Sequence, residues 1–345
     1  MTPSYPRPIR GPGDAPSLGG MVTDRDKKVF GGGSRLTWRD LPAAVRALIE
    51  GRLGSPVVGA VSAPGGFTPG LASRVDSAAG STVFIKAISA AQTPDGPLFY
   101  RREIEMASAL PAAAPAPRLL WSHDDGDWVV LAFEHVEGRN PDPAVRTHRE
   151  ALLQALERLA LTLTPSPVRA PRLVDQRRRD FSGWRDLLDT AEPASVASYG
   201  QDVPGALSRL AVLEEGWAAA ADGETLLHGD VRTDNTIITP DGRLVFVDWP
   251  HACLGAAWVD LVLALPSLAM AGVDAQGVVA SHPLTRDVDP RALDCVVVAV
   301  AGFFVSGSLL PAPPGLPTLR EFQRRQAVAC LEWLRRRSVL RPNLD

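Results

Sequence analysis

Apolar stretches of strand length fill the first part of the chain, with short breaker segments between them. Each stretch is rich in Val, Ile, Leu or Phe and is bounded by Gly, Pro, Ser or Asp. Stretches of this length and composition are typical of β-strands. The pattern predicts strands at residues 57–62, 71–75, 82–87, 118–122 and 128–133.

Helical spacing of apolar residues appears twice in this region and dominates the rest of the chain. Residues 41–49 place Leu and Val on one helical face, and residues 99–110 have the same spacing. Further helical segments are predicted at 146–163, 172–220 with breaks at Pro193 and Pro204, 256–271, 290–310 and 317–339. The pattern predicts an α+β chain with a disordered segment at 1–34, a small β-rich lobe at 35–138 and a larger, mostly helical lobe at 139–345.

Residues 225–248 combine strand patterns with a cluster of polar residues. Strands are expected at 225–228, 236–239 and 244–247, and Asp241-Gly242 suggests a two-residue hairpin turn. That turn would place Asn235 directly opposite Asp248, about 5 Å apart. A carboxylate and an amide oxygen at this distance suit Mg²⁺, and Asp230 on the preceding loop could accept a hydroxyl proton. The arrangement suggests phosphoryl transfer.

These residues also resemble a known family. The segment His228-Gly229-Asp230-Val231-Arg232-Thr233-Asp234-Asn235, followed by Val247-Asp248-Trp249, resembles the catalytic loop and metal-binding Asp of the protein-kinase-like fold. It resembles the aminoglycoside phosphotransferase and choline kinase family more closely. The resemblance implies a two-lobed kinase-like fold that uses ATP, or another nucleoside triphosphate, and Mg²⁺.

The resemblance also implies roles for individual residues. Asp230 would be the catalytic base and Arg232 would touch the transferred phosphate, whereas Asn235 and Asp248 would hold the metal ion. His228 and Asp260 would support the catalytic loop, Asp260 by bonding its backbone.

The small lobe carries candidates for nucleotide binding. Residues 63–70 are rich in Gly, so the main chain of Gly65, Gly66 and Phe67 could approach phosphate closely. Lys27, Lys28 and Lys86 are the only lysines in a chain that otherwise uses Arg. Because Lys86 ends an apolar strand, we expect that this position requires a compact ammonium and that a guanidinium would not fit.

The resemblance extends to the partners of these groups. Val83-Phe84-Ile85-Lys86 resembles the kinase strand whose Lys holds the nucleotide phosphates. In the family a Glu of the following helix pairs with this Lys, and Glu103 is the expected partner, with Glu105 as the alternative. Residues 131–138 resemble the hinge between lobes, where main-chain groups of Glu134 and Val136 would bind the base.

The segment after Asp248 bears on the substrate. Trp249-Pro250 replace the Phe-Gly of protein kinases, no long activation segment follows, and residues 249–260 soon enter a helical pattern. A small molecule with a hydroxyl group is therefore favoured over a protein as the substrate. Residues 171–184 are expected to cover the substrate and contain more Arg than Asp, which favours a neutral or anionic compound over a polycationic antibiotic.

Composition narrows the remaining possibilities. The net charge of −3 gives no reason to expect a nucleic-acid partner. Three scattered cysteines favour a reducing cytoplasm, and the longest apolar run, 295–310, is too short to predict a membrane span.

Two other functions fit the same residues. The chain could be a catalytically inactive, nucleotide-binding regulatory module. It could also be a metal-dependent hydrolase that uses His228, Asp230, Asp248 and His251, although that leaves Lys86 unexplained.

Overall fold

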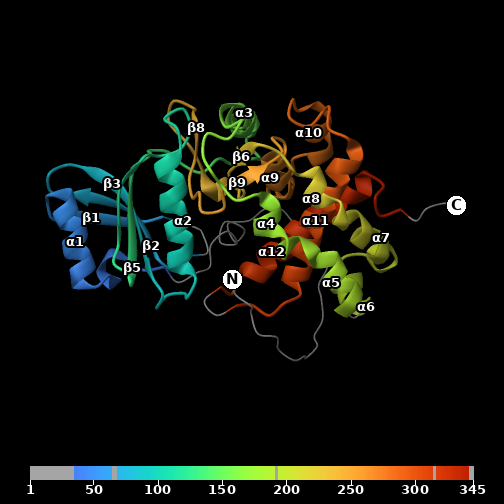
Figure 1. Ribbon diagram of the computed structural model, residues 1–345, viewed down its shortest axis with the longest axis horizontal. Coiled ribbons are helices and arrows are strands. Elements are labelled where there is room, and N and C mark those ends of the chain that lie inside the picture. Colours follow the sequence, from blue (N-terminus) through green and yellow to red (C-terminus); the bar gives the residue numbers. More distant parts are fainter. Residues whose placement is uncertain (1–34, 64–67, 191–192, 314–315, 342–345) are drawn as a thin grey trace.

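The chain forms a β-rich N-terminal lobe beside a larger helical lobe (Figure 1). The computed structural model describes residues 35–63, 68–190, 193–313 and 316–341. The segment predicted to be disordered, 1–34, lies outside the described residues. The N-terminal lobe consists of η2 (Trp38–Asp40), α1 (Ala43–Leu53), β1 (Val57–Ser62), β2 (Leu71–Ser77), β3 (Thr82–Ser89), α2 (Gly96–Ala109), β4 (Leu119–Asp124) and β5 (Trp128–Glu134).

The five strands predicted from the sequence form one antiparallel sheet in the order β1-β2-β3-β5-β4. Successive residues of a strand point to opposite faces, so the sheet buries two sets of side chains. On β5, Val130 and Ala132 pack with α1, whereas Val129 and Leu131 pack with α2. Helix α2 covers the sheet face that is turned toward the helical lobe (Figure 1).

Helices make up most of the C-terminal lobe. They are α3 (Arg146–Thr162), α4 (Leu173–Arg177), η3 (Asp180–Ser182), α5 (Gly183–Thr190), α6 (Pro193–Ala197), α7 (Val203–Glu215), α8 (Trp217–Ala220), η4 (Thr233–Asn235), α9 (Val259–Met270), α10 (Ala275–Ser281), α11 (Pro290–Ser308) and α12 (Leu319–Arg336). Pro193 and Pro204 lie in the first turns of α6 and α7, where the missing N–H of proline costs nothing. Helix α10 was not predicted.

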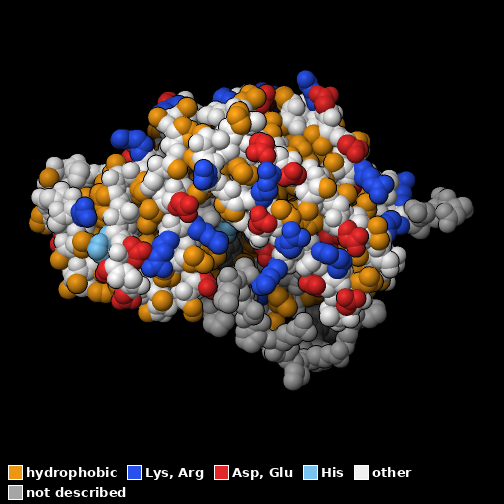
Figure 2. Space-filling model, viewed as in Figure 1, with side chains coloured by type: hydrophobic (Ala, Val, Ile, Leu, Met, Phe, Trp, Pro, Cys, Tyr) orange, Lys and Arg blue, Asp and Glu red, His pale blue; other side chains and the backbone are white. Residues whose placement is uncertain are grey.

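Helix α11 is the centre of this lobe. It packs against α5, α7, α8, α9 and α12. Among the described residues it is the one helix long and apolar enough to cross a membrane, but its central residues Val296 to Gly302 are buried by these neighbours. Acidic and basic side chains are interspersed on the outer surface (Figure 2), and several of them pair, as Arg335 does with Asp202 at 2.7 Å.

Two small antiparallel sheets lie where the helical lobe meets the N-terminal lobe. One pairs β6 (Thr225–Leu227) with β9 (Cys253–Gly255), and the other pairs β7 (Thr236–Ile238) with β8 (Leu244–Phe246). The helix predicted at 256–271 is present as α9, whereas no strand was predicted at 253–255, which supply the only partner strand of β6 in the described chain.

The predicted register of the β7–β8 hairpin was wrong by one residue. Ile238 pairs with Leu244, and Thr239 N–H donates to Arg243 O at 2.9 Å. The loop therefore has three residues, 240–242, and its last residue, Gly242, adopts the left-handed conformation with φ 81°. As a consequence, Asn235 lies opposite Val247, whose N–H donates to Asn235 O at 2.9 Å, and not opposite Asp248.

Candidate active site

The loop that follows β6 is held in place by a buried carboxylate. Asp260, at the start of α9, accepts hydrogen bonds from the main-chain N–H of His228 at 2.7 Å and of Gly229 at 2.9 Å. Burial raises the pKa of Asp260, and these two N–H groups oppose that effect by stabilising the ionised form. The backbone contact predicted for Asp260 is thus present.

His228 supports the same loop with its side chain. Its Nε2–H donates to Val247 O at 2.9 Å, and its Nδ1 accepts from Asp230 N–H at 3.3 Å. These two bonds require the neutral imidazole with the proton on Nε2. The ring also packs edge-on against Trp249, with 4.7 Å between ring centroids. Trp249 is buried and donates its indole N–H to Phe246 O, so the Trp that replaces the kinase Phe has a clear structural role.

Gly229 cannot be replaced without moving the backbone. Its φ is 77°, and a Cβ atom built on it would lie 2.3 Å from the carbonyl oxygen of His251. Only glycine allows the two chain segments to approach this closely.

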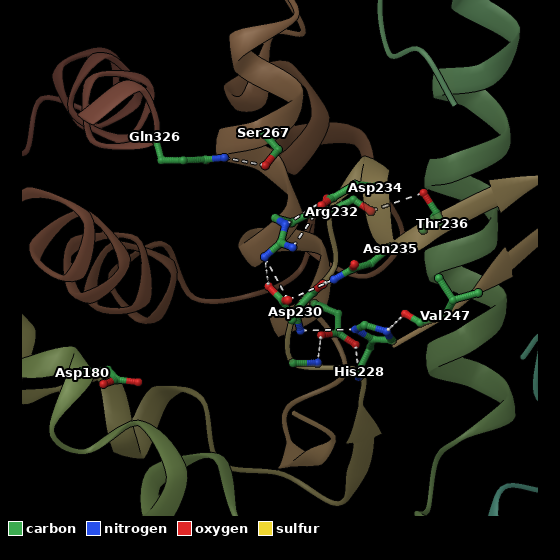
Figure 3. Close-up of polar contacts among 12 residues, drawn as sticks. Asp180, His228, Asp230, Arg232, Asp234, Asn235, Thr236, Val247, Ser267 and Gln326 are labelled. Carbon is green, nitrogen blue, oxygen red and sulfur yellow. Dashed lines mark hydrogen bonds and ion pairs between the residues drawn. The ribbon is translucent and has the colours of Figure 1, made fainter. Parts of the chain in front are cut away.

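The carboxylate of Asp230 is bound on both oxygens (Figure 3). Arg232 Nη1 lies 2.9 Å from each oxygen, and Asn235 Nδ2 donates to Oδ2 at 2.9 Å. The other edge of the Arg232 guanidinium binds Asp234 through Nε and Nη2, at 3.0 and 3.1 Å. Burial opposes the charge of Arg232, but the carboxylates of Asp230 and Asp234 outweigh it and raise its pKa. Three predicted residues, Asp230, Arg232 and Asn235, therefore meet in one network.

Lys86 joins the two lobes. Its ammonium on β3 binds Glu103 of α2 and also donates to Asp248 Oδ1, which follows β8, at 2.7 Å. Phe84, Lys86 and Ile88 point to the sheet face that α2 covers, which is why the ammonium meets that helix. Glu103 is buried, whereas the alternative, Glu105, is exposed. The pairing of Lys86 with Glu103 is thus the one that the sequence favoured.

The two carboxylates around Lys86 have different environments. Burial raises the pKa of Glu103 to about 7, although Lys86 opposes this effect. Burial also works against ionisation of Asp248, but there the ammonium of Lys86 prevails and lowers the pKa. Lys86 itself keeps its proton, because the two carboxylates outweigh the cost of burying its charge. Asp248 is therefore the ionised partner, and Glu103 is the one that takes up a proton first.

The donor set around Asp248 suits a hard cation. Its Oδ1 binds Lys86, and Asn235 uses its NH₂ group for Asp230, which leaves one carboxylate oxygen and one amide oxygen for other partners. Such oxygens are the ligands that Mg²⁺ prefers. Asp248 also has φ 70°, an unusual conformation for a residue with a side chain. Residues that hold such a conformation are often part of a functional site.

The remaining nucleotide-site predictions are not tested by the described residues. Gly65, Gly66 and Phe67 lie outside the described residues. Glu134 ends β5, where its N–H donates to Arg118 O at 3.0 Å and its carboxylate binds the Arg118 side chain. Val136 lies just after that strand. Binding of a base at Glu134 and Val136 stays a prediction.

A cavity of about 220 Å³ opens beside Asp230. The sequence did not predict most of its lining, which comes from α4, η3, α9, α11 and α12. Of the arginines expected to cover the substrate, Arg177 lines the cavity, whereas Arg172 binds Asp222 and Glu224 instead. His251 also lines the cavity, and burial together with Arg177 lowers its pKa to about 4.

The sequence matches one protein family over most of its length. Residues 74–288 match the sequence model of the phosphotransferase enzyme family (APH). The chain belongs to this family. The matched region contains Lys86, Glu103, the loop from His228 to Asn235, Asp248 and Asp260.

Two homoserine kinases are among the curated relatives of the chain. The protein from Methylobacterium sp. (strain 4-46) is 28% identical over 189 residues, which cover 50% of this chain and 56% of the relative. The protein from Methylobacterium nodulans is 27% identical over 200 residues, which cover 54% of this chain and 60% of the relative. The match thus spans little more than half the length of these relatives.

Solved structures have the same fold as the chain. A thermostable mutant of aminoglycoside phosphotransferase APH(4)-Ia has a TM-score of 0.53 at 15% identity, and the match covers 83% of this chain and 98% of that one. Choline kinase LicA from Streptococcus pneumoniae has a TM-score of 0.55 at 12% identity, with 86% and 99% covered. The α+β, protein-kinase-like fold predicted from the sequence is confirmed.

The described residues do not support the hydrolase alternative. Among the described residues, no group of three or more His, Cys, Asp and Glu side chains is arranged to hold a metal ion. Both ring nitrogens of His228 are already bonded to the main chain, so His228 is not available as a ligand.

Proposed function

We propose that this phosphotransferase uses ATP and Mg²⁺ to phosphorylate a hydroxyl group of a small molecule. The observation that carries the proposal is the link from Lys86 to Glu103 and Asp248, which joins the N-terminal lobe to the segment beside the Asp230 loop. A structural ion pair would need only one carboxylate. The second carboxylate adds negative charge to this cluster, which a divalent cation held at Asp248 would offset.

In the proposed reaction each group has one task. The acceptor hydroxyl attacks the γ-phosphorus, its new P–O bond replaces the bond to the β-phosphate oxygen, and ADP leaves. Asp230 accepts the hydroxyl proton. Lys86 and Arg232 supply positive charge for the phosphates. Asn235 and Asp248 would hold Mg²⁺, which neutralises phosphate charge when bound.

The neighbourhood of Asp230 supports its role as base. Arg232 and Asn235 fix the orientation of the carboxylate, and Asp260 and His228 fix the loop that carries it. Catalysis of phosphoryl transfer depends mainly on positioning and charge, and both are features of this loop.

The test is Asp230→Asn, with Asp241→Asn as the matched control. Asp241 is an exposed acid in the nearby β7–β8 turn. Asp230→Asn should reduce kcat by at least ~100-fold, because the base is lost, while the Kd for ATP stays within about threefold of the original value. Release of ADP and formation of phosphorylated product measure the first quantity, and calorimetry measures the second.

Two results would overturn the proposal. If the Asp230→Asn variant kept its activity, Asp230 would not be the catalytic base. ATP binding by the unaltered protein with no acceptor-dependent transfer across a broad panel of hydroxyl compounds would instead favour the inactive, nucleotide-binding module.

A further inference from the structure

The cavity beside Asp230 has a mostly apolar wall. Phenylalanine rings from η3, α11 and α12 line it, and the Phe181 and Phe303 rings meet at 6.2 Å while Phe303 and Phe304 meet at 5.1 Å. Phe322 lies on the opposite helix, and the Arg232 guanidinium lies 5.8 Å from its ring centroid. Such a wall favours the apolar part of a ligand.

The charges around the cavity offer no partner to a cationic acceptor. Asp230 is the one acid among the described residues that line it, and Arg232 and Asn235 already bind its carboxylate. An ammonium group placed here would also face Arg177. Burying a cation without a free carboxylate is unfavourable.

The cavity has little to attract an anionic acceptor either. Arg177 binds Asp180 at 3.0 Å and donates to Gly229 O at 3.1 Å. Arg232 is bound by Asp230 and Asp234. Both guanidiniums that line the cavity are thus compensated by carboxylates, and Arg232 has a task at the transferred phosphate.

One buried polar atom in the cavity lining has no hydrogen-bond partner among the described residues. Gln326 on α12 is 1% exposed, and its Nε2 donates to Ser267 Oγ at 2.7 Å. Its Oε1 is buried and accepts no hydrogen bond from the described residues. Both residues line the cavity, and Figure 3 shows them on the side of Arg232 opposite His228. A buried carbonyl oxygen without a donor is costly, so this atom indicates a ligand with an O–H or N–H group.

We propose, on the basis of the proposed function, that the acceptor is a small, uncharged, largely apolar compound. It carries two hydroxyl groups, or one hydroxyl and one neutral N–H group. One hydroxyl receives the phosphate beside Asp230, and the second donor binds Gln326 Oε1. The volume of about 220 Å³ is below the roughly 300–1,000 Å³ of sites for drug-sized ligands, which favours a compound of one ring or a short chain.

The first experiment compares acceptors with the unaltered protein, Mg²⁺ and ATP, and detects the phosphorylated product. The probes are a neutral cyclohexane-type diol series, the corresponding mono-alcohols, L-homoserine, and an aminoglycoside with four ammonium groups. The diols should have the highest kcat/KM, by on the order of 100-fold over the charged probes, and about tenfold over the mono-alcohols. If homoserine or the aminoglycoside is the best acceptor, the substrate class is wrong although the proposed function stands.

The second experiment tests Gln326 directly. Gln326→Leu removes the polar group at nearly constant volume and should raise KM for the best diol about tenfold, with KM for ATP and kcat unchanged. Discrimination between diol and mono-alcohol should vanish in this variant. A merely structural role would lower stability without removing this discrimination.

Gln276→Leu is the matched control. Gln276 also accepts hydrogen bonds in the helical lobe, from Trp333 and Arg337, but does not line the cavity. This variant should keep the diol preference. If Gln326→Leu still discriminates between diol and mono-alcohol, the inference is wrong. If the unaltered protein transfers phosphate to none of the probes, the proposed function is wrong instead.

Discussion

Replacing Glu103 by Gln tests whether the buried triad with Lys86 and Asp248 serves the nucleotide. The change keeps the size of the side chain and an oxygen that can accept from Lys86, and removes only the negative charge. The Glu103 side chain is 2% exposed and that of Lys86 is 11% exposed, so water screens their interaction weakly. Lys86 would keep one ionic partner, Asp248, at 2.7 Å.

The expected loss of interaction energy follows from the change of the Lys86 hydrogen bond from an ionic to a neutral acceptor. An ionic hydrogen bond contributes about 1.5–3 kcal/mol and a neutral one about 0.5–1.5 kcal/mol, so the change removes about 1–2 kcal/mol of orientation energy. If Lys86 binds the phosphates, KM for ATP should rise about 5- to 30-fold. The free energy of unfolding should not fall at pH 8, because folding raises the pKa of Glu103 and the ionised carboxyl therefore destabilises the folded protein there.

The pH dependence sharpens this prediction. The pKa of Glu103 is raised to about 7 by burial, so its carboxyl is largely neutral at pH 6 and largely ionised at pH 8. A neutral carboxyl resembles the amide of Gln. The difference in KM between the two proteins should therefore be larger at pH 8 than at pH 6.

Steady-state kinetics with varied ATP and denaturant titrations measure both effects. Glu105→Gln is the matched control, because Glu105 lies on the same helix but is exposed. Equal KM values for Glu103→Gln and Glu105→Gln at pH 8 would refute the reasoning.

Two further predictions concern the Asp230 loop and the segment that contacts it at His251. Gly229→Ala should lower the free energy of unfolding by about 3 kcal/mol and reduce kcat strongly, because φ is 77° and the new methyl would lie 2.3 Å from His251 O. Gly242→Ala is the control, because φ is 81° there but the space around it is open; it should lower the free energy of unfolding by only about 1 kcal/mol and leave kcat unchanged. Equal losses of stability in the two variants would contradict the close approach of Gly229 to His251. His251→Gln tests how the free energy of unfolding depends on acid, measured by denaturant titration from pH 7 to 4. The pKa of His251 falls from 6.5 to about 4 on folding, so His251 contributes stability above pH 6.5. About 3 kcal/mol of this stability is lost as the pH falls toward 4. The stability difference between the two proteins should shrink by that amount in acid, and a constant difference would show that His251 is not buried in its neutral form.

The sequence determined the parts of the site that depend on local pattern. Apolar stretches of strand length predicted the five strands of the N-terminal sheet, and the spacing from His228 to Asp248 identified the Asp230 loop and the hairpin after it. The isolated Lys86 and the helix with Glu103 were also visible, because a lysine at the end of an apolar strand contrasts with a chain that uses Arg elsewhere. Strand period decides which face a side chain occupies, and this information is local.

Tertiary structure decided what depends on distant segments. Lys86 and Asp248 are 162 residues apart, and no local pattern predicted their hydrogen bond. The hairpin register was missed because Asp-Gly fits both a two-residue and a three-residue loop. The residues of the cavity, Gln326 among them, lie on helices whose apolar faces look like ordinary core. Only the packing of α11 and α12 around the catalytic loop shows which of those side chains face an opening and which fill the interior.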